Sequence, residues 1–200
     1  ILGTEVVVME KLDGANASFG IIDGKLKMFS RNQELNEHNT LRGFYDWVRH
    51  NVDPRKLFVS TIYFGEWLVP HTVQYKKEVQ NEFYLFDIYD VKTDTYLDWN
   101  ITVQAAKHLG LRTPEVFFRG ELHSMTDVDK YLGQSELTDI PNAGEGIVVK
   151  DYEGQQFVKI VSDKFKETKS IKQPSLDRTD IGTLIDSVLT PQRVEKLIHK

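Results

Sequence analysis

The chain has 200 residues, of which 40% are hydrophobic, and its formal net charge at pH 7 is −5. This length and composition indicate a globular fold with its own core, and no run of about 18 apolar residues is present to cross a membrane. Because the sequence has no cysteine, disulfides, thiolate zinc sites and cysteine nucleophiles are excluded, and we expect a cytoplasmic or other reducing intracellular compartment.

The pattern of apolar residues and turn signals predicts many short strands with a few short helices between them. The dipeptides Asp23-Gly24 and Glu153-Gly154 each separate two apolar runs, as expected at the turns of hairpins. In chain order we expect strands at residues 5–10, 17–22 and 25–31, a helix at 40–51, strands at 56–67 and 82–90, short helices at 101–109 and 126–132, and strands at 146–151 and 155–161.

Strands dominate this pattern, which favours an α+β fold with antiparallel sheets over a doubly wound parallel sheet. From Lys172 the sequence changes to a connector followed by amphipathic helices, with Thr190 and Pro191 as a helix cap and first helical position. We therefore expect one domain over residues 1–168 and a helical C-terminal extension over residues 169–200, which starts a truncated domain or packs back on the main body.

Several segments combine residue types that suit chemistry on phosphates. The tetrapeptide Lys11-Leu12-Asp13-Gly14 places a lysine at the end of the first expected strand, although alone it is more simply explained as a surface turn. The histidines lack the spacing of a zinc site, and His71 is most simply explained as a solvated or hydrogen-bonded loop residue. Five further segments follow in order: Ser30-Arg31-Asn32, Phe64-Gly65-Glu66-Trp67, the aromatic segment 83–88, the glycine-rich segment 144–150 and the segment 157–160.

The order of these six segments resembles motifs I, Ia, III, IIIa, IV and V of the covalent nucleotidyltransferases, which comprise DNA ligases, RNA ligases and mRNA capping enzymes. The chain is most similar to ATP-dependent RNA ligases of the RNA ligase 2-like group. This resemblance implies an antiparallel-sheet nucleotidyltransferase domain with short helices, an ATP-grasp-like ligase fold. The chain departs from that group at Asp13, where histidine is frequent, and at Val161, where many members have a second lysine.

Lys11 is the expected nucleophile. Attack on the α-phosphate of ATP requires an uncharged amine, and the pKa of a lysine falls readily on desolvation or beside other cations. The resemblance implies that Lys11 forms a covalent lysyl–AMP and releases pyrophosphate, with Glu145 and Lys159 as the other catalytic residues. Glu145 is the expected ligand of Mg²⁺ or Mn²⁺, because such an ion accepts one carboxylate together with water and phosphate oxygens.

The resemblance also implies which residues hold the nucleotide. Glu66 accepts a hydrogen bond from the ribose hydroxyls, and Phe86 stacks on the adenine. Glu10, Asp13 and Arg31 complete the expected cofactor-binding set together with the two catalytic lysines, and Asp13 orients the loop more than it touches substrate. From the residues alone, a salt bridge also explains Glu66, and core packing also explains Phe86.

Arg31, Lys150 and Lys164 are the residues expected to contact RNA. The five fixed donors of Arg31 suit a phosphate or an RNA end, although a surface ion pair also explains it. Lys150 and Lys164 are weaker candidates. Lys164 lies in a lysine cluster between Lys159 and Lys172, which is a local basic face on an acidic chain or, more simply, a solvated helix surface.

The resemblance alone favours RNA over DNA, and it implies an RNA ligase, a class associated with RNA repair, that joins RNA 5′-phosphate and 3′-hydroxyl ends. AMP passes from ATP to the lysine and then to the 5′-phosphate, after which the 3′-hydroxyl displaces AMP. A DNA ligase and a GTP-using capping guanylyltransferase remain alternatives, but both normally carry an OB-fold after the last motif, where this chain shows helix-like sequence. A catalytically inactive module that binds nucleotide or RNA ends is a further alternative. The expected partners are ATP and RNA ends, with no membrane, and an additional flanking domain is left open.

Overall fold

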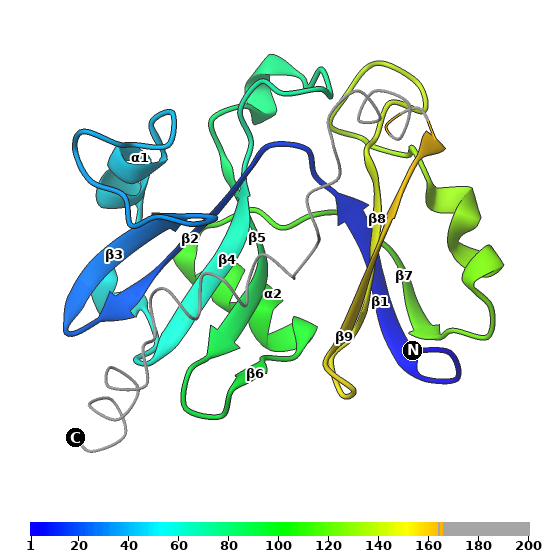
Figure 1. Ribbon diagram of the computed structural model, residues 1–200, viewed down its shortest axis with the longest axis horizontal. Helices are drawn as coiled ribbons and strands as arrows, with labels where there is room; N and C mark the ends of the chain where they lie inside the picture. The colour runs from blue at the N-terminus through cyan, green and yellow to red at the C-terminus, as the bar shows by residue number, and fades with distance from the viewer. Residues whose placement is uncertain (164, 166–200) are drawn as a thin grey trace. The chain divides into compact units, whose positions relative to one another are not determined.

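The computed structural model describes residues 1–163 and residue 165, which form two compact units (Figure 1). Unit 1 comprises Ile1–Gly14, Leu68–Glu82 and the described residues from Thr113 onward, and unit 2 comprises Ala15–Trp67 and Phe83–Arg112. Within the described residues, no helix is long and apolar enough to pass through a lipid bilayer. The segments of the two units alternate along the chain.

Most of the regular secondary structure in the described chain is antiparallel strand. The α-helices are α1 (Phe44–Asn51) and α2 (Trp99–Leu109), and short 3₁₀ helices cover Pro54–Lys56, Lys77–Val79 and Met125–Tyr131. The strands are β1 (Glu5–Lys11), β2 (Ala15–Ile22), β3 (Lys25–Ser30), β4 (Thr61–Trp67), β5 (Phe83–Asp90), β6 (Thr95–Tyr96), β7 (Val116–Glu121), β8 (Gly146–Asp151) and β9 (Gln156–Val161). All pairs of neighbouring strands in the two sheets are antiparallel, which confirms the predicted fold class.

Unit 1 is built on a four-stranded sheet with the strand order β7-β1-β8-β9. β1 is a central strand, which fits its continuous apolar run at residues 6–9. Because side chains alternate across a strand, one face of the sheet carries Val8 and Val149, which belong to a buried cluster with Val128 of the 3₁₀ helix. The opposite face carries Lys11 at the end of β1.

Unit 2 is built on a five-stranded sheet with the strand order β3-β2-β4-β5-β6. Asp23 and Gly24 have φ angles of 52° and 72°, so the hairpin between β2 and β3 turns as the dipeptide predicts. The ring of Phe44 in α1 lies 5.6 Å from that of Trp67 and 5.3 Å from that of Phe83, measured between ring centroids. These aromatic contacts hold α1 against the sheet, and α2 packs beside β5 (Figure 1).

Gly65 of β4 has no room for a side chain. A Cβ atom here would overlap the ring of Phe83 and the carbonyl group of Tyr84, both on the neighbouring strand β5. We expect Gly65→Ala to lower the free energy of unfolding by about 3 kcal/mol, because the sheet must open locally to admit the methyl group. Urea unfolding measures this loss.

Gly24→Asn is the matched control for Gly65→Ala. A Cβ atom at Gly24 meets open space, and asparagine tolerates a positive φ, so this variant should cost less than about 1 kcal/mol. An equal loss of stability in both variants would contradict the steric explanation.

The helix expected at residues 40–51 begins later, at Phe44. The three residues before it, Leu41, Arg42 and Gly43, have φ angles of 47°, 55° and 95°. Such left-handed conformations cannot continue a right-handed helix. The apolar pattern therefore predicted the buried face of the helix but placed its start one turn too early.

Two further expectations differ from the structure in extent or type. The strand expected at residues 56–67 begins at Thr61, directly after Ser60, whose φ angle is 62°. The helix expected at residues 126–132 is present as the 3₁₀ helix Met125–Tyr131. In both cases the apolar pattern located the element but did not fix its start or its hydrogen-bond pattern.

The sequence did not predict strand β7, which pairs with β1 at the edge of the unit 1 sheet. Its residues are all half-buried or exposed, so they lack the alternation of buried and exposed residues that identifies a strand. The helical extension expected over residues 169–200 lies outside the described residues, and the boundary at residue 168 stays a prediction.

Candidate active site

Lys11 lies at the C-terminal end of β1, next to a buried carboxylate. Its Nζ atom is 2.5 Å from Oε2 of Glu145, and the side chains of Lys11 and Glu145 are 19% and 2% exposed. The sheet brings the two residues together, because Lys11 pairs with Gly146 and Glu145 immediately precedes β8. The side chain of Lys11 is therefore partly accessible, while its acidic partner holds the amine at a defined position.

Lys159 shares a sheet face with Lys11. On β9, Lys159 pairs with Val148 of β8, which in turn pairs with Met9, two residues before Lys11. Since side chains two residues apart on a strand point to the same side, this register places both lysines on one face of the unit 1 sheet. Lys159 is exposed, so its charge is available to an anion bound on that face.

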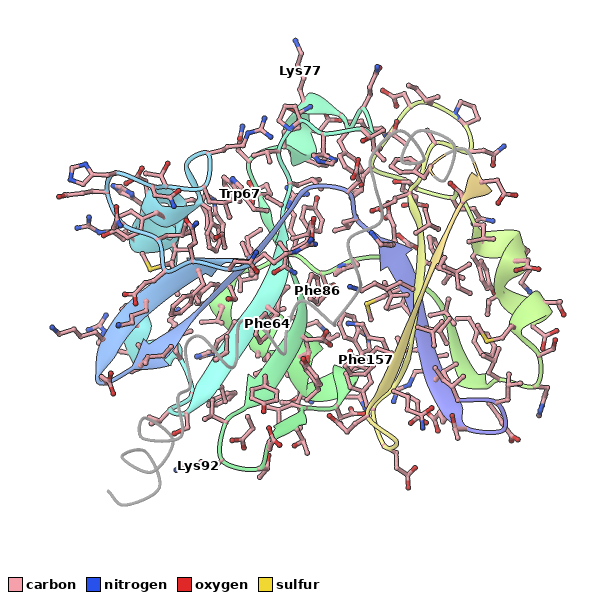
Figure 2. All side chains as sticks on the ribbon, in the orientation of Figure 1. Phe64, Trp67, Lys77, Phe86, Lys92 and Phe157 are labelled. Atoms are coloured by element: carbon pink, nitrogen blue, oxygen red, sulfur yellow. The ribbon has the colours of Figure 1, made fainter. Side chains whose placement is uncertain are left out.

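Lys150 also lies on this face, but its side chain is largely enclosed. It is 3% exposed, and its Nζ atom lies 5.8 Å from the ring centroid of Tyr152 and 5.5 Å from that of Phe157. Figure 2 shows Phe157 on β9, the strand that pairs with β8 at Lys150. Cation–π contacts of this kind favour a role of Lys150 in packing, and its contact with RNA stays a prediction.

The side chain of Glu10 projects from the face opposite to Lys11. It is 2% exposed, and neither carboxylate oxygen makes a hydrogen bond of normal geometry within the described chain. Burial raises the pKa of Glu10 to about 7; the Ser135 hydroxyl opposes this effect, and the nearby carboxylates of Glu115 and Glu136 add to it. Glu10 is thus a desolvated carboxylate, and its contact with nucleotide stays a prediction.

Asp13 anchors the turn that follows Lys11. Its Oδ1 atom is 2.6 Å from Nδ1 of His71, and its Oδ2 atom accepts a hydrogen bond of 2.8 Å from the backbone N–H of Val73. The backbone N–H of Asp13 donates to the phenol oxygen of Tyr75 at 2.8 Å. Asp13 is 4% exposed, so the motif after Lys11 is tied to the loop at residues 71–75.

In unit 2, Phe86 lies at a bulge in β5. Phe64 pairs with Asp87, whereas the next residue Gly65 pairs with Leu85, so Phe86 is an extra residue in the ladder. A bulge redirects a side chain and is frequent beside active sites. Phe86 is half-buried and packs against the core cluster that contains Phe64 (Figure 2). Its ring therefore takes part in core packing and also remains partly accessible.

Glu66 and Arg31 lie at strand ends of the same unit. Glu66 is half-buried on β4, where it pairs with Asn16 of β2 and Tyr84 of β5. Arg31 directly follows β3 and is exposed. These positions suit a half-buried hydrogen-bond acceptor and a solvent-facing cation, as the predicted roles require.

The structure therefore distributes the predicted site residues over both units. Lys11 and Glu145 are in contact, Lys159 shares their sheet face, and Arg31, Glu66 and Phe86 belong to unit 2. Lys164 lies outside the described residues. The sequence did not reveal the link between Asp13 and the loop, because His71 lies 58 positions further along the chain and no local spacing marks such a contact.

Comparison with known proteins decides the family. The RNA ligase family model matches residues 4–168, which is most of the chain. The chain belongs to the RNA ligase family. No curated protein matches this RNA ligase family member closely enough to count as a relative.

Solved RNA ligases share its fold. A mutant of Naegleria gruberi RNA ligase without ligand is 25% identical at a TM-score of 0.68, covering 84% of this chain and 52% of that chain. A second such mutant is 22% identical at a TM-score of 0.69, covering 85% and 52%. A third mutant, with ATP and Mn, is 23% identical at a TM-score of 0.67, covering 84% and 52%. This member of the RNA ligase family thus spans about half the length of the solved RNA ligases that it matches.

Proposed function

We propose that the chain is the nucleotidyltransferase domain of an ATP-dependent RNA ligase, in which Lys11 becomes covalently attached to AMP. The observation that carries this proposal is the contact between Lys11 and the buried Glu145, at the end of a central strand and on one sheet face with Lys159. Membership of the RNA ligase family supports the choice of RNA as the acceptor. The ATP and Mn present in one solved Naegleria gruberi mutant support the choice of nucleotide and of a divalent ion.

The first step forms a bond between Nζ of Lys11 and the α-phosphorus of ATP. The amine gives up a proton to water before attack, the bond to the bridging oxygen breaks, and pyrophosphate leaves. Lys159 stabilises phosphate charge from the same sheet face. AMP then moves to an RNA 5′-phosphate, and an RNA 3′-hydroxyl displaces it to seal the strand. These later steps, and a role in RNA repair, extend the proposal beyond the first step.

Glu145 is the residue proposed to hold Mg²⁺ or Mn²⁺. Among residues 1–163 and 165, no group of three or more histidine or acidic side chains is arranged as a metal site. A single buried carboxylate nevertheless fits Mg²⁺, which keeps several waters and shares phosphate oxygens with protein ligands. When bound, such an ion neutralises charge on the phosphate oxygens.

Residues of unit 2 are proposed to bind the nucleoside and a phosphate. The bulge at Phe86 supports stacking on the adenine, because it leaves a half-buried ring where regular pairing is interrupted. The half-buried Glu66 suits hydrogen bonds from the ribose hydroxyls, and Arg31 suits a phosphate or the RNA end. Glu10 and Asp13 complete the proposed nucleotide-binding set.

Intact-mass measurement after incubation with ATP and Mg²⁺ tests the proposal. The chain should gain about 329 Da, the mass of one AMP on lysine. Added pyrophosphate should remove this mass again, because the step is reversible. A gain with GTP and none with ATP would assign the chain to capping chemistry. No gain with either nucleotide, from folded protein that carries no AMP beforehand, would overturn the proposal.

A further inference from the structure

We infer that His71 is a positioning residue for the attachment of AMP to Lys11: it holds the carboxylate of Asp13 and so fixes the turn behind the nucleophile. This inference rests on the proposed function of Lys11. The geometry lies entirely within unit 1, where Lys11, Asp13 and the loop at residues 71–75 all belong.

Every polar group of Asp13 that faces the loop is engaged. The two carboxylate oxygens are held by His71 at 2.6 Å and by the Val73 N–H at 2.8 Å. The backbone N–H of Asp13 is held by Tyr75 at 2.8 Å. The loop therefore forms hydrogen bonds with both the side chain and the backbone of Asp13. These bonds restrain the position and orientation of the turn that follows Lys11.

Tyr75 accepts the hydrogen bond from the backbone of Asp13 as a neutral phenol. It is 6% exposed, and burial raises its pKa well above the usual range, to which the nearby carboxylates of Glu10, Asp13 and Glu145 add. A neutral phenol oxygen accepts the hydrogen bond from Asp13 without placing a second negative charge beside that carboxylate. The loop thus contributes donors to the Asp13 side chain and an acceptor to its backbone.

The proton in the contact between His71 and Asp13 belongs to the histidine. An ionised carboxylate only accepts hydrogen bonds, so Nδ1 of His71 carries the proton in either a neutral or a charged ring. The His71 side chain is 48% exposed, whereas that of Asp13 is 4% exposed. Removing the imidazole therefore takes little surface out of the core but leaves one oxygen of a buried carboxylate without its donor.

Because His71 is half exposed and Asp13 is buried, replacing His71 should slow the attachment of AMP more than it destabilises the fold. A displacement of about 1 Å at a reacting group can cost roughly 100-fold in rate, and Lys11 is joined to Asp13 through a single intervening residue. The contact of Lys11 with Glu145 does not involve His71, so the nucleophile keeps its acidic partner when the turn loosens. Binding of ATP by the other candidate residues should also be retained.

Three variants of His71 test the inference. The side-chain N–H of His71→Asn lies close to the position of Nδ1, whereas that of His71→Gln lies closer to Nε2. In single turnovers with ATP and Mg²⁺, His71→Ala and His71→Gln should form the AMP adduct roughly 10- to 100-fold more slowly than the parent chain. His71→Asn should stay within about 3-fold of the parent, and the ATP concentration at half-maximal rate should change less than about 3-fold in all three.

His123→Ala is the matched control. His123 belongs to the same unit, is 74% exposed and lies near the exposed Glu121, so its removal should leave the rate unchanged. Unfolding in urea shows whether each variant is folded. If His71→Ala is not folded, the comparison between the asparagine and glutamine variants decides, because both keep a polar side chain.

The outcomes separate the inference from the proposed function. If the parent chain forms no AMP adduct, the proposed function fails. An active parent with an equally fast His71→Ala variant would overturn the positioning role. The same conclusion would follow if His71→Asn were as slow as His71→Ala, because the donor to Asp13 would then not be the reason for the loss.

Discussion

Lys11→Arg forms no AMP adduct in the proposed reaction. The guanidinium stays protonated at any pH at which the protein is folded, so it offers no electron pair to the α-phosphorus. Arginine also keeps a positive charge near Glu145, whose side chain is 2% exposed. Lys11→Ala should lose the adduct as well. It also leaves the buried carboxylate of Glu145 without its cation, so a loss of stability can accompany the loss of the nucleophile.

Intact mass after incubation with ATP and Mg²⁺ measures this result, with the fold monitored by urea unfolding. Lys27→Ala serves as the control, because the half-buried Lys27 makes an ion pair with the exposed Glu34 in unit 2 and should leave the adduct intact. A folded Lys11→Arg chain that still gains the mass of AMP would place the nucleophile elsewhere.

Glu10→Gln should stabilise the protein at alkaline pH. Burial raises the pKa of Glu10 from 4.5 to about 7, so the folded chain holds a proton that the unfolded chain has lost. Below pH 4.5 the Glu10 carboxyl group is protonated in both the folded and the unfolded state, so it does not alter the free energy of unfolding. As pH rises towards 7, the folded state loses stability relative to the unfolded state, and the loss above pH 7 is about 3 kcal/mol.

A neutral amide in place of Glu10 removes this loss. The variant should therefore unfold at a higher urea concentration than the parent at pH 8, and the two should be similar near pH 4.5. Glu121→Gln is the control, because Glu121 is exposed and its replacement should not alter the pH dependence. The stability of Glu10→Gln could instead fall between pH 5 and pH 7 as steeply as that of the parent. In that case the burial of a charged Glu10 is not the cause of the parent's loss of stability.

The sequence predicted those parts of the fold that local chemistry determines. Asp23-Gly24 marked its hairpin, because few other dipeptides adopt two positive φ angles easily, and the apolar run at residues 6–9 marked a central strand. The start of α1 was wrong because Leu41 and Arg42 adopt left-handed conformations that their side chains do not favour.

The candidate site was predictable only in part. The order of the motifs placed Lys11 and Glu145 in one predicted site, and the two side chains are in contact in the structure. The contact of Asp13 with His71 was out of reach, because it joins residues 58 positions apart and depends on how the loop folds back. The bulge at Phe86 was equally hidden, since register in a sheet is set by pairing between strands and not by either strand alone.

The alternation of segments between the two units has a consequence for synthesis on the ribosome. Among the described strands, β1, which carries Lys11, pairs with β7 and β8, whose first residues are Val116 and Gly146. During synthesis, β1 therefore has no strand to pair with until more than 100 further residues have been made. Lys11, the proposed nucleophile, is thus among the last residues of the described chain to reach its final position, although it precedes most of them in the sequence.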